Sequence, residues 1–551
     1  MKRPAVVFGL CIVAVAVGAF AIRLPRLDQR PMHPDEANEA TRAGILFDTG
    51  QYHYDPKDHH GPSLYYLTLP SLAVGGAARF ADTTESDYRI VPVLFGVGLV
   101  FLLVLAGDGL GRPAAVVAGV LTAISPAMVF YSRYYIQETL LVFFTLATIV
   151  SAWRYVRSGG TGWAVAAGLA FGLMAATKET WVLAAAAMIV AAVLTVLWGR
   201  WRDACLPDRQ DGPAPARTWF GPWRLVLAVV AAAAVAAALY SSFGTNPAGL
   251  RDAVRAYGSY AEKAGGELHR HPWYFYLAML IWDHPARGFV WSEGLIVGLA
   301  VVGLVAALMR KSGKGSDLAL LRFLGFYTVA LTALYAAIPY KTPWCALGFL
   351  DGMILMAGVG AVSLVRWMPT AWAKVAVGLV LVALAAHLGW ESYRLNFRLY
   401  ADQRNPYVYA HASTDVLNLA RHMDRLAQAS PSGRDLLVKV ISSENPWPLP
   451  WYLRKFDRVG WWRIGAPDDA DLAAGWYKSV PDDADADVVI ATTDLKEDLD
   501  KRLRGSYNKQ GIYGLRPGVL LMVYVDERLW DTFLLQQAGP RPAPEAGGGL
   551  P

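Results

Sequence analysis

The stretch His33-Pro34-Asp35-Glu36-Ala37-Asn38-Glu39 is the feature around which the rest of the chain is organised. It follows the first apolar segment, and Pro34 suits the first turn of a helix. Acidic residues in that turn favour the positive end of the helix dipole. The pattern predicts a helix that continues to about Asp48 and stops at Gly50. Because neighbouring helical side chains point about 100° apart, Asp35 and Glu36 cannot act from the same face.

Two interpretations of this acidic pair stand side by side. The acids could simply cap a helix. Alternatively, one of them could meet a substrate hydroxyl while the other meets a metal or a structural partner. The second interpretation is favoured by the specific polar residues that follow in the same segment, which are Tyr52, Tyr54, Asp55, Lys57, Asp58, His59, His60, Gly61 and Pro62.

The composition predicts a polytopic α-helical membrane protein. Of the 551 residues, 55% are hydrophobic and only 17% are charged. Apolar runs of membrane-spanning length recur through the first 390 residues. We expect eleven spans, at 5–22, 90–107, 113–130, 136–153, 162–177, 181–198, 225–243, 289–308, 319–338, 343–365 and 372–390.

Charge and cysteine usage exclude other classes. The net charge of +6 requires no nucleic-acid partner, because basic loops on the cytoplasmic face account for it. The three cysteines, Cys11, Cys205 and Cys345, fall in separate segments. This spacing predicts neither a disulfide framework nor a zinc site.

Basic residues gather in alternate loops and predict the orientation. They place the N-terminus in the cytoplasm, and an odd number of spans then places the C-terminal part outside it. Loop 245–288 carries basic residues on the outside and argues mildly against this topology. Residues 1–22 also resemble a signal peptide, but their apolar run is long for one, so we expect a retained span. The expected location is the cell membrane.

Further polar residues are expected at the outer boundary. Within the first outside loop, 23–89, residues 62–78 are apolar enough to form a helix in the membrane interface. Glu138 begins an otherwise apolar helix, where a carboxylate is costly unless it is paired, for example with Arg133, or used. Lys178 lies in a short outer turn and could be a snorkelling interfacial anchor or an anion contact. Two prolines flank Lys341, which favours a preset anion contact there.

After residue 390 the composition changes and predicts a small α/β domain over 391–536. We expect helices at 412–428 and 494–504, and strands at Leu436–Ser442, Asp487–Thr492 and Val519–Val525. A segment with Glu444, Trp447, Trp451 and Tyr452 lies between the first two strands. The tail, 537–551, is rich in Pro and Gly and is expected to be disordered. The sequence contains no Gly-rich phosphate loop, nucleotide fingerprint or repeat of fixed period.

The candidate polar residues all fall at one predicted boundary. They are Asp35, Glu36, His59, His60, Arg89, Arg133, Glu138, Lys178 and Lys341. Carboxylates and basic groups at an outer lipid edge suit a lipid-linked phosphate substrate. The basic groups would hold the phosphate, and a carboxylate would take a proton from the incoming nucleophile. The lack of a nucleotide motif fits a donor presented by a lipid.

These features resemble the GT-C superfamily of membrane glycosyltransferases, which includes the dolichyl-phosphate-mannose protein mannosyltransferases and the bacterial aminoarabinose transferases. A prokaryotic branch described as flippase-activity-associated and mannosyltransferase-like is more similar still. The resemblance covers residues 1–390, and in the tail only Trp447–Arg454. It is carried by His33-Pro34-Asp35-Glu36-Ala37, Tyr54-Asp55-Pro56, His60-Gly61-Pro62, Arg133…Glu138, Lys178-Glu179 and Tyr340-Lys341-Thr342-Pro343-Trp344.

The resemblance implies a GT-C-like fold of about eleven transmembrane helices in residues 1–390. It also implies an inverting transfer of a sugar, of the hexosyl or mannosyl type, from a polyprenyl-phosphate donor to an acceptor glycan, lipid or protein. Asp35 would be the general base, with Glu36 and Glu138 as supporting acids. Asp35 and Glu138 could also hold Mg²⁺ or Mn²⁺, although the superfamily often has Asp where this chain has Glu138.

The remaining roles concern the two substrates. The donor phosphate would contact Lys341, Arg89, Arg133 and Lys178, and the acceptor would contact His59, His60 and Tyr54. A transporter or flippase component without catalysis is the main alternative, and a scaffold whose outer domain binds a partner is another. Clustering at one face, rather than at mid-membrane, argues against transport.

Overall fold

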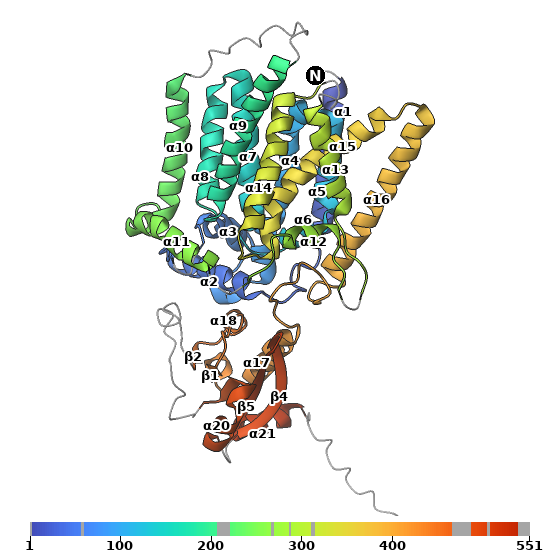
Figure 1. Cartoon of the computed structure of the whole chain (residues 1–551). Helices are drawn as coiled ribbons and strands as arrows, with labels where there is room; N and C mark the ends of the chain where they lie inside the picture. The colour runs from blue at the N-terminus through green and yellow to red at the C-terminus, as the bar shows by residue number, and fades with distance from the viewer. Residues whose placement is uncertain are drawn as a thin grey trace, which may run out of the picture. The chain divides into compact units, whose positions relative to one another are not determined.

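The computed structural model describes residues 3–56, 60–205, 221–265, 269–285, 288–309, 315–464, 486–503 and 507–537 (Figure 1). The chain forms two compact units. The first contains Met1–Gln29, Arg42–Arg79 and Thr83–Tyr409. The second contains Arg30–Thr41, Phe80–Asp82 and Ala410–Pro551.

The first unit is a bundle of apolar helices. Within the described residues, eight helices are long and apolar enough to cross a membrane, namely α1 (Arg3–Arg23), α4 (Glu85–Leu110), α7 (Glu138–Ser158), α9 (Trp181–Cys205), α10 (Pro222–Tyr240), α14 (Leu318–Ala337), α15 (Leu347–Trp367) with its preceding turn η2 (Pro343–Ala346), and α16 (Ala371–Phe397). Of the four shorter apolar helices in the described part of the chain, three coincide with predicted spans, namely α5 (Arg112–Ile124), α8 (Thr161–Ala175) and α13 (Gly294–Leu308). Each of the eleven predicted spans overlaps one of these helices, and their number as true spans stays a prediction.

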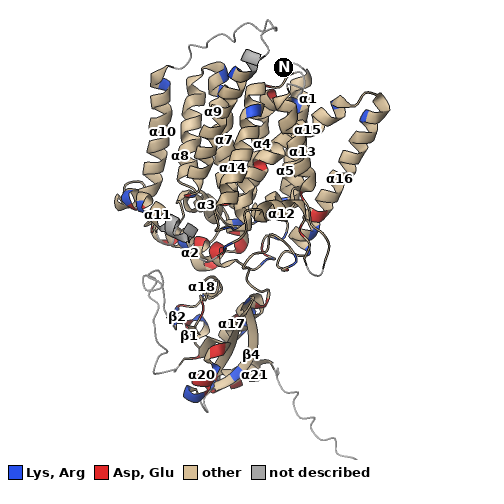
Figure 2. Ribbon diagram, in the orientation of Figure 1, with Lys and Arg blue, Asp and Glu red and all other residues tan. Residues whose placement is uncertain are grey.

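The distribution of charge fits a bilayer environment. Charged residues mostly gather at the ends of the long helices and in the segments between them (Figure 2). The lateral faces of α10 and α16 carry exposed apolar side chains, among them Val229, Val230, Leu379 and Val382. Such faces are stable in lipid and costly in water. The chain is therefore a multi-span membrane protein, while its orientation remains the prediction made above.

One predicted span, 113–130, is wrong as a continuous helix. α5 ends at Ile124 and a separate helix, α6 (Pro126–Tyr131), follows. Ser125 caps α6 by accepting a hydrogen bond from the Met128 amide, and Pro126 cannot donate one to continue α5. The buried Glu293 carboxylate fixes the break by accepting from Ser125 Oγ at 2.6 Å and from the Ala127 amide at 2.9 Å.

The bundle is packed closely enough for backbones to touch. An added Cβ at Gly303 of α13 would lie 2.0 Å from the Met356 carbonyl oxygen of α15. One at Gly360 of α15 would lie 1.9 Å from the Leu299 carbonyl oxygen of α13. Small residues permit this approach, as is usual between membrane helices.

Shorter helices lie in the segments between the long ones. They are α3 (Ser63–Val74), α11 (Ala248–Gly265) and α12 (Phe275–Ile281). α3 coincides with the apolar segment 62–78 that was predicted to be helical. α2 (Pro34–Thr49) begins at the predicted proline and is followed by Gly50, whose φ of +67° ends the helix. Its first half contributes to the second unit and its second half to the first.

The second unit is an α/β domain built on a five-stranded sheet of order β2-β1-β3-β5-β4. β1 pairs in parallel with β2 and β3, whereas β5 pairs antiparallel with β3 and β4. The strands and helices are α17 (Asp415–Ala429), β1 (Leu437–Ser442), α18 (Leu449–Tyr452), β2 (Arg458–Arg463), β3 (Val488–Thr492), α20 (Lys496–Arg502), β4 (Tyr507–Arg516), β5 (Val519–Asp526) and α21 (Glu527–Gln537).

Both faces of the sheet are covered. Val488 and Ile490 of β3 pack with α17 and α21, whereas Val489 and Ala491 pack with α20. This alternation follows from the two-residue period of a strand. The three predicted strands are present, but sequence analysis missed β2 and β4. α16 continues past residue 390, where the sequence placed the domain boundary, and the predicted disordered tail lies almost entirely outside the described residues.

Candidate active site

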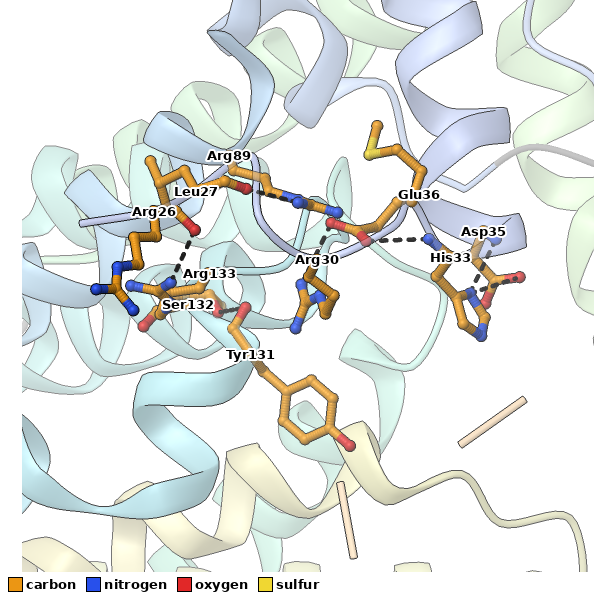
Figure 3. Close-up of polar contacts among 12 residues, drawn as sticks. Arg26, Leu27, Arg30, His33, Asp35, Glu36, Arg89, Tyr131, Ser132 and Arg133 are labelled. Atoms are coloured by element: carbon orange, nitrogen blue, oxygen red, sulfur yellow. Dashed lines mark hydrogen bonds and ion pairs between the residues drawn. The ribbon is translucent and has the colours of Figure 1, made fainter. Parts of the chain in front are cut away.

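The opening of α2 is capped by His33 and Glu36. The His33 Nδ1 atom accepts a hydrogen bond from the Asp35 amide at 3.0 Å, and Glu36 Oε2 accepts from the His33 amide at 3.1 Å. These reciprocal bonds are a variant of the capping box. Arg30 lies 3.5 Å from the other oxygen of Glu36, which is fully buried (Figure 3). Glu36 therefore has a structural role.

Asp35 is left with a different environment. Its side chain is 52% exposed, and its Oδ1 lies 3.8 Å from His33 Nδ1. The backbone groups that a capping residue would satisfy are already bonded to His33 and Glu36. The interpretation of this acidic pair as a simple helix cap thus applies to Glu36, and the Asp35 carboxylate remains accessible.

In the first unit, Glu138 forms a buried ion pair with Lys178. Their side chains are 5% and 8% exposed. Burial by itself lowers the pKa of Lys178, but the Glu138 carboxylate outweighs burial and raises this pKa overall. Lys178 is therefore a buried cation, and the alternative of a snorkelling anchor is wrong. Glu138 pairs with Lys178, whereas the sequence suggested Arg133 as its partner.

A small pocket lies beside this ion pair. Leucine, valine, alanine and glycine residues form about half of its lining. The other lining residues are larger or more polar, and they are Glu138, Thr145, Thr180, Tyr327, Tyr335, Trp344 and Cys345. An apolar pocket with a few convergent polar groups is the usual form of a small-molecule site.

Glu179, next to Lys178, gathers two of the predicted acceptor residues. Its Oε2 lies 2.9 Å from His60 Nδ1, and its Oε1 accepts a hydrogen bond from the Tyr54 hydroxyl at 3.2 Å. Burial raises the pKa of Glu179, but His60 outweighs burial and lowers it overall. Burial and Glu179 together raise the pKa of Tyr54, so its hydroxyl stays a donor. His59, the third predicted acceptor residue, lies outside the described residues.

In the sequence, Glu179 was noted only as part of the Lys178-Glu179 motif. Its contacts with Tyr54 and His60 were not predicted. Two adjacent residues in one short turn, Lys178 and Glu179, connect the ion pair of Glu138 with the contacts of Tyr54 and His60. The signal that could have revealed it is the same as for Glu138. A carboxylate beside an apolar membrane segment needs a partner.

Arg89 and Arg133, two predicted phosphate contacts, bind backbone carbonyl groups at the end of α1 and just after it. Arg89 donates to the Leu27 carbonyl oxygen at 2.6 Å. Arg133 donates to the carbonyl oxygen of Arg23 at 2.8 Å. It also donates to the carbonyl oxygen of Arg26 at 3.2 Å (Figure 3). Both arginines are buried. These bonds give them a structural role, and their contact with a donor stays a prediction.

Lys341 is also buried, and its ammonium donates to the Ile338 carbonyl oxygen. Its amide donates to the His269 carbonyl oxygen at 3.0 Å. The rings of His269 and His271 approach the Tyr409 hydroxyl at 2.6 and 3.3 Å. Burial lowers the pKa of Lys341, and burial together with His269 and Lys341 lowers that of His271. Lys341 thus lies near two histidines, and its contact with a donor phosphate stays a prediction.

A metal ion at Asp35 and Glu138 stays a prediction. Among the described residues, no group of three or more His, Cys, Asp or Glu side chains converges. One carboxylate oxygen of Glu138 accepts from the Lys178 ammonium, whereas the other, Oε2, is buried and has no hydrogen-bond partner among the described residues. We therefore derive no step through Mg²⁺ or Mn²⁺.

Comparison with known proteins gives a partial family match and a fold. Residues 65–243, less than half of the chain, match the family model of dolichyl-phosphate-mannose-protein mannosyltransferase. No curated protein sequence matches the chain. The structure of ArnT from Cupriavidus metallidurans bound to undecaprenyl phosphate matches with a TM-score of 0.59 and 15% identity, over 93% of this chain and 97% of that one.

A second similar structure is the oligosaccharyltransferase AglB from Archaeoglobus fulgidus in complex with an inhibitory peptide and a dolichol-phosphate. It matches with a TM-score of 0.49 and 12% identity, over 97% of this chain and 77% of that one. The match to ArnT, together with the family match, confirms the fold predicted from the sequence, and the chain has the GT-C fold of membrane glycosyltransferases.

Proposed function

We propose that this chain of the GT-C fold is an inverting glycosyltransferase that moves a sugar from a polyprenyl-phosphate donor to an acceptor outside the cytoplasm. The matched family model is named for mannosyl transfer from dolichyl phosphate, and the ArnT structure holds undecaprenyl phosphate. Both support a lipid-linked donor. A hexosyl or mannosyl group is the proposed sugar.

The proposal rests mainly on the different environments of Asp35 and Glu36. Glu36 is buried and closes the cap of α2, whereas Asp35 keeps an accessible carboxylate at the same helix end. A general base must reach the proton that it removes, and only the exposed member of the pair can do so. The helix end supplies fixed geometry, because His33 and Glu36 hold its first turn.

The reaction follows from these groups. Asp35 accepts the proton of an acceptor hydroxyl, and the hydroxyl oxygen attacks the anomeric carbon of the sugar. The bond between that carbon and the phosphate oxygen breaks, and its electron pair stays with the polyprenyl phosphate. Attack opposite the leaving group inverts the anomeric configuration. A positioned base typically contributes about 10²–10⁴-fold to the rate.

Basic groups would stabilise the leaving phosphate. Lys341 is the proposed contact, because it lies next to His269 and His271 and is held between two prolines. Lys178 is already paired with Glu138, so it would contribute mainly by keeping the adjacent pocket charged at one side.

A transfer assay with purified protein in lipid nanodiscs tests this function. Radiolabelled polyprenyl-phosphate sugars would be offered beside the matching sugar nucleotides, each with short glycan, lipid and peptide acceptors. We expect product from the lipid-linked donor alone, with inverted anomeric configuration by NMR. Parallel samples with EDTA and with added Mg²⁺ or Mn²⁺ test the metal prediction.

The same assay distinguishes a glycosyltransferase from the main alternative, a transporter or flippase component without catalysis. In sealed vesicles, movement of the labelled donor across the bilayer without any transfer would contradict the proposal and favour a transporter. Transfer from a sugar nucleotide would contradict the proposed donor class while leaving a glycosyltransferase.

A further inference from the structure

The segment before the proposed base is bound by the C-terminal α/β unit. Residues Arg30–Thr41 belong to the same compact unit as Ala410–Pro551. The Met32 amide donates a hydrogen bond to the Tyr452 hydroxyl at 2.8 Å, and the Met32 side chain is fully buried. Met32 is three residues before Asp35, so its position sets where α2 begins.

A second contact within the α/β unit involves His33, the residue after Met32. The ring of His411 lies edge-on to the ring of His33, with 5.0 Å between their centroids. His33 is the residue whose Nδ1 accepts from the Asp35 amide. His411 is buried, so it can hold the His33 ring in place. Two neighbouring residues of the segment are therefore fixed by two different parts of the α/β unit.

Tyr452 lies in a short helix that is restrained by the packing of the neighbouring residue, Trp451. The neighbouring Trp451 is fully buried, and its ring lies 5.8 Å from that of Phe80. The guanidinium of Arg454 stacks 3.7 Å from the centroid of the Trp451 ring, and it donates to the Trp451 carbonyl oxygen at 2.6 Å. Stacking of this kind restrains a short helix that has few hydrogen bonds of its own.

We propose that Tyr452 and His411 are positioning residues for Asp35, so that the α/β unit is needed for transfer. This inference rests on the proposed function. Tyr452 sets the backbone at Met32, and His411 sets the imidazole that binds the Asp35 amide. A displacement of about 1 Å in a reacting group can lower a rate by about 10²-fold. Neither residue needs to touch either substrate.

Substitution of Tyr452 tests the backbone contact in the full-length protein. Tyr452→Phe removes only the hydroxyl that accepts from Met32. Tyr513→Phe is the matched control, because it removes a hydroxyl bonded to His422 at 2.7 Å in the same unit. We expect Tyr452→Phe to lower kcat about 10- to 100-fold at unchanged donor affinity, and Tyr513→Phe to keep wild-type kcat.

His411 supplies a second test that does not depend on Tyr452. His411→Ala should lower kcat with unchanged donor affinity. His411→Phe, which keeps an aromatic ring against His33, should recover much of the loss. Equal kcat values for His411→Ala and the wild type would contradict the inference, and so would a His411→Phe variant as slow as His411→Ala.

Hydrogen exchange distinguishes failure of this inference from failure of the proposed function. Amides in the peptide covering residues 30–41 should exchange faster in Tyr452→Phe than in the wild type, and Tyr513→Phe should leave them unchanged. This readout requires no enzyme activity. A wild type without transfer would overturn the function, whereas unchanged exchange at 30–41 in Tyr452→Phe would overturn the positioning role.

Discussion

Replacement of Lys178 by Met should strongly destabilise the membrane unit. The substitution keeps most of the side-chain volume but leaves the Glu138 carboxylate buried without its cation. The two side chains are only 8% and 5% exposed, so water cannot replace the missing partner. The neighbouring pocket is mostly apolar and offers little compensation.

The size of the effect follows from this burial. Removing one member of a buried ion pair costs about 3–5 kcal/mol, whereas an exposed pair contributes about 0–1 kcal/mol. We therefore expect a loss of about 3–5 kcal/mol for Lys178→Met and a similar loss for Glu138→Gln. The double variant contains no buried charge at this position. It should be less destabilised than the sum of the single variants by about 2 kcal/mol or more.

Equilibrium unfolding in mixed detergent micelles, followed by tryptophan fluorescence, measures the free energy of unfolding. The wild type, the two single variants and the double variant would be compared. A loss of 3 kcal/mol corresponds to roughly a hundredfold change in the unfolding equilibrium, which is well within reach of such a titration. Losses below about 1 kcal/mol that simply add in the double variant would refute the reasoning. They would mean that the pair is solvated and behaves as a surface ion pair.

Three further predictions concern other contacts. Glu36→Gln should lower the free energy of unfolding by about 1–3 kcal/mol and Asp35→Asn by at most about 1 kcal/mol, and equal melting temperatures would contradict these roles. Tyr54→Phe should cost about 1.5–3 kcal/mol, because its hydroxyl donates to the buried Glu179, and unaltered melting would argue against that bond. Burial lowers the pKa of His422 below 6.5, so its contribution to stability is present above pH 6.5 and is lost as the pH falls through the folded-state pKa. Melting curves between about pH 7.5 and 5 should show this loss in the wild type but not in His422→Gln.

The membrane helices could be predicted from the sequence because long apolar runs have few other uses. The break at Ser125 was missed because the residues on both sides of it are equally apolar. Its local signal, a serine followed by Pro126, was visible. The partner that completes it, Glu293, is far away in the sequence and could not be inferred without the fold.

In the α/β domain, the buried strands could be predicted and the edge strands could not. β1, β3 and β5 lie inside the sheet and consist of nearly continuous apolar residues. β2 and β4 are the two edges, where pairing occurs on one side only and polar residues are tolerated. Their sequences, with Gly460 in β2 and Gly511 and Gly514 in β4, also weaken a strand pattern.

The sequence predicted the residues of the candidate site better than it predicted the contacts between them. Helical geometry alone indicated that Asp35 and Glu36 must have different roles. It could not indicate which of them is buried, because that depends on Arg30 and on the unusual use of the His33 ring as a cap. The pairing of Glu138 with Lys178 likewise depends on how α7 meets the turn between α8 and α9.

The rate of a single turnover in Asp35→Asn tests the central claim most directly. Wild type and variant would be loaded with labelled polyprenyl-phosphate sugar and mixed with excess acceptor, with Asp48→Asn at the other end of α2 as the control. The account predicts wild-type donor binding and melting in Asp35→Asn but a transfer rate lower by about 10²–10⁴-fold, and a wild-type rate in Asp48→Asn. An Asp35→Asn protein that transfers sugar at the wild-type rate would contradict it.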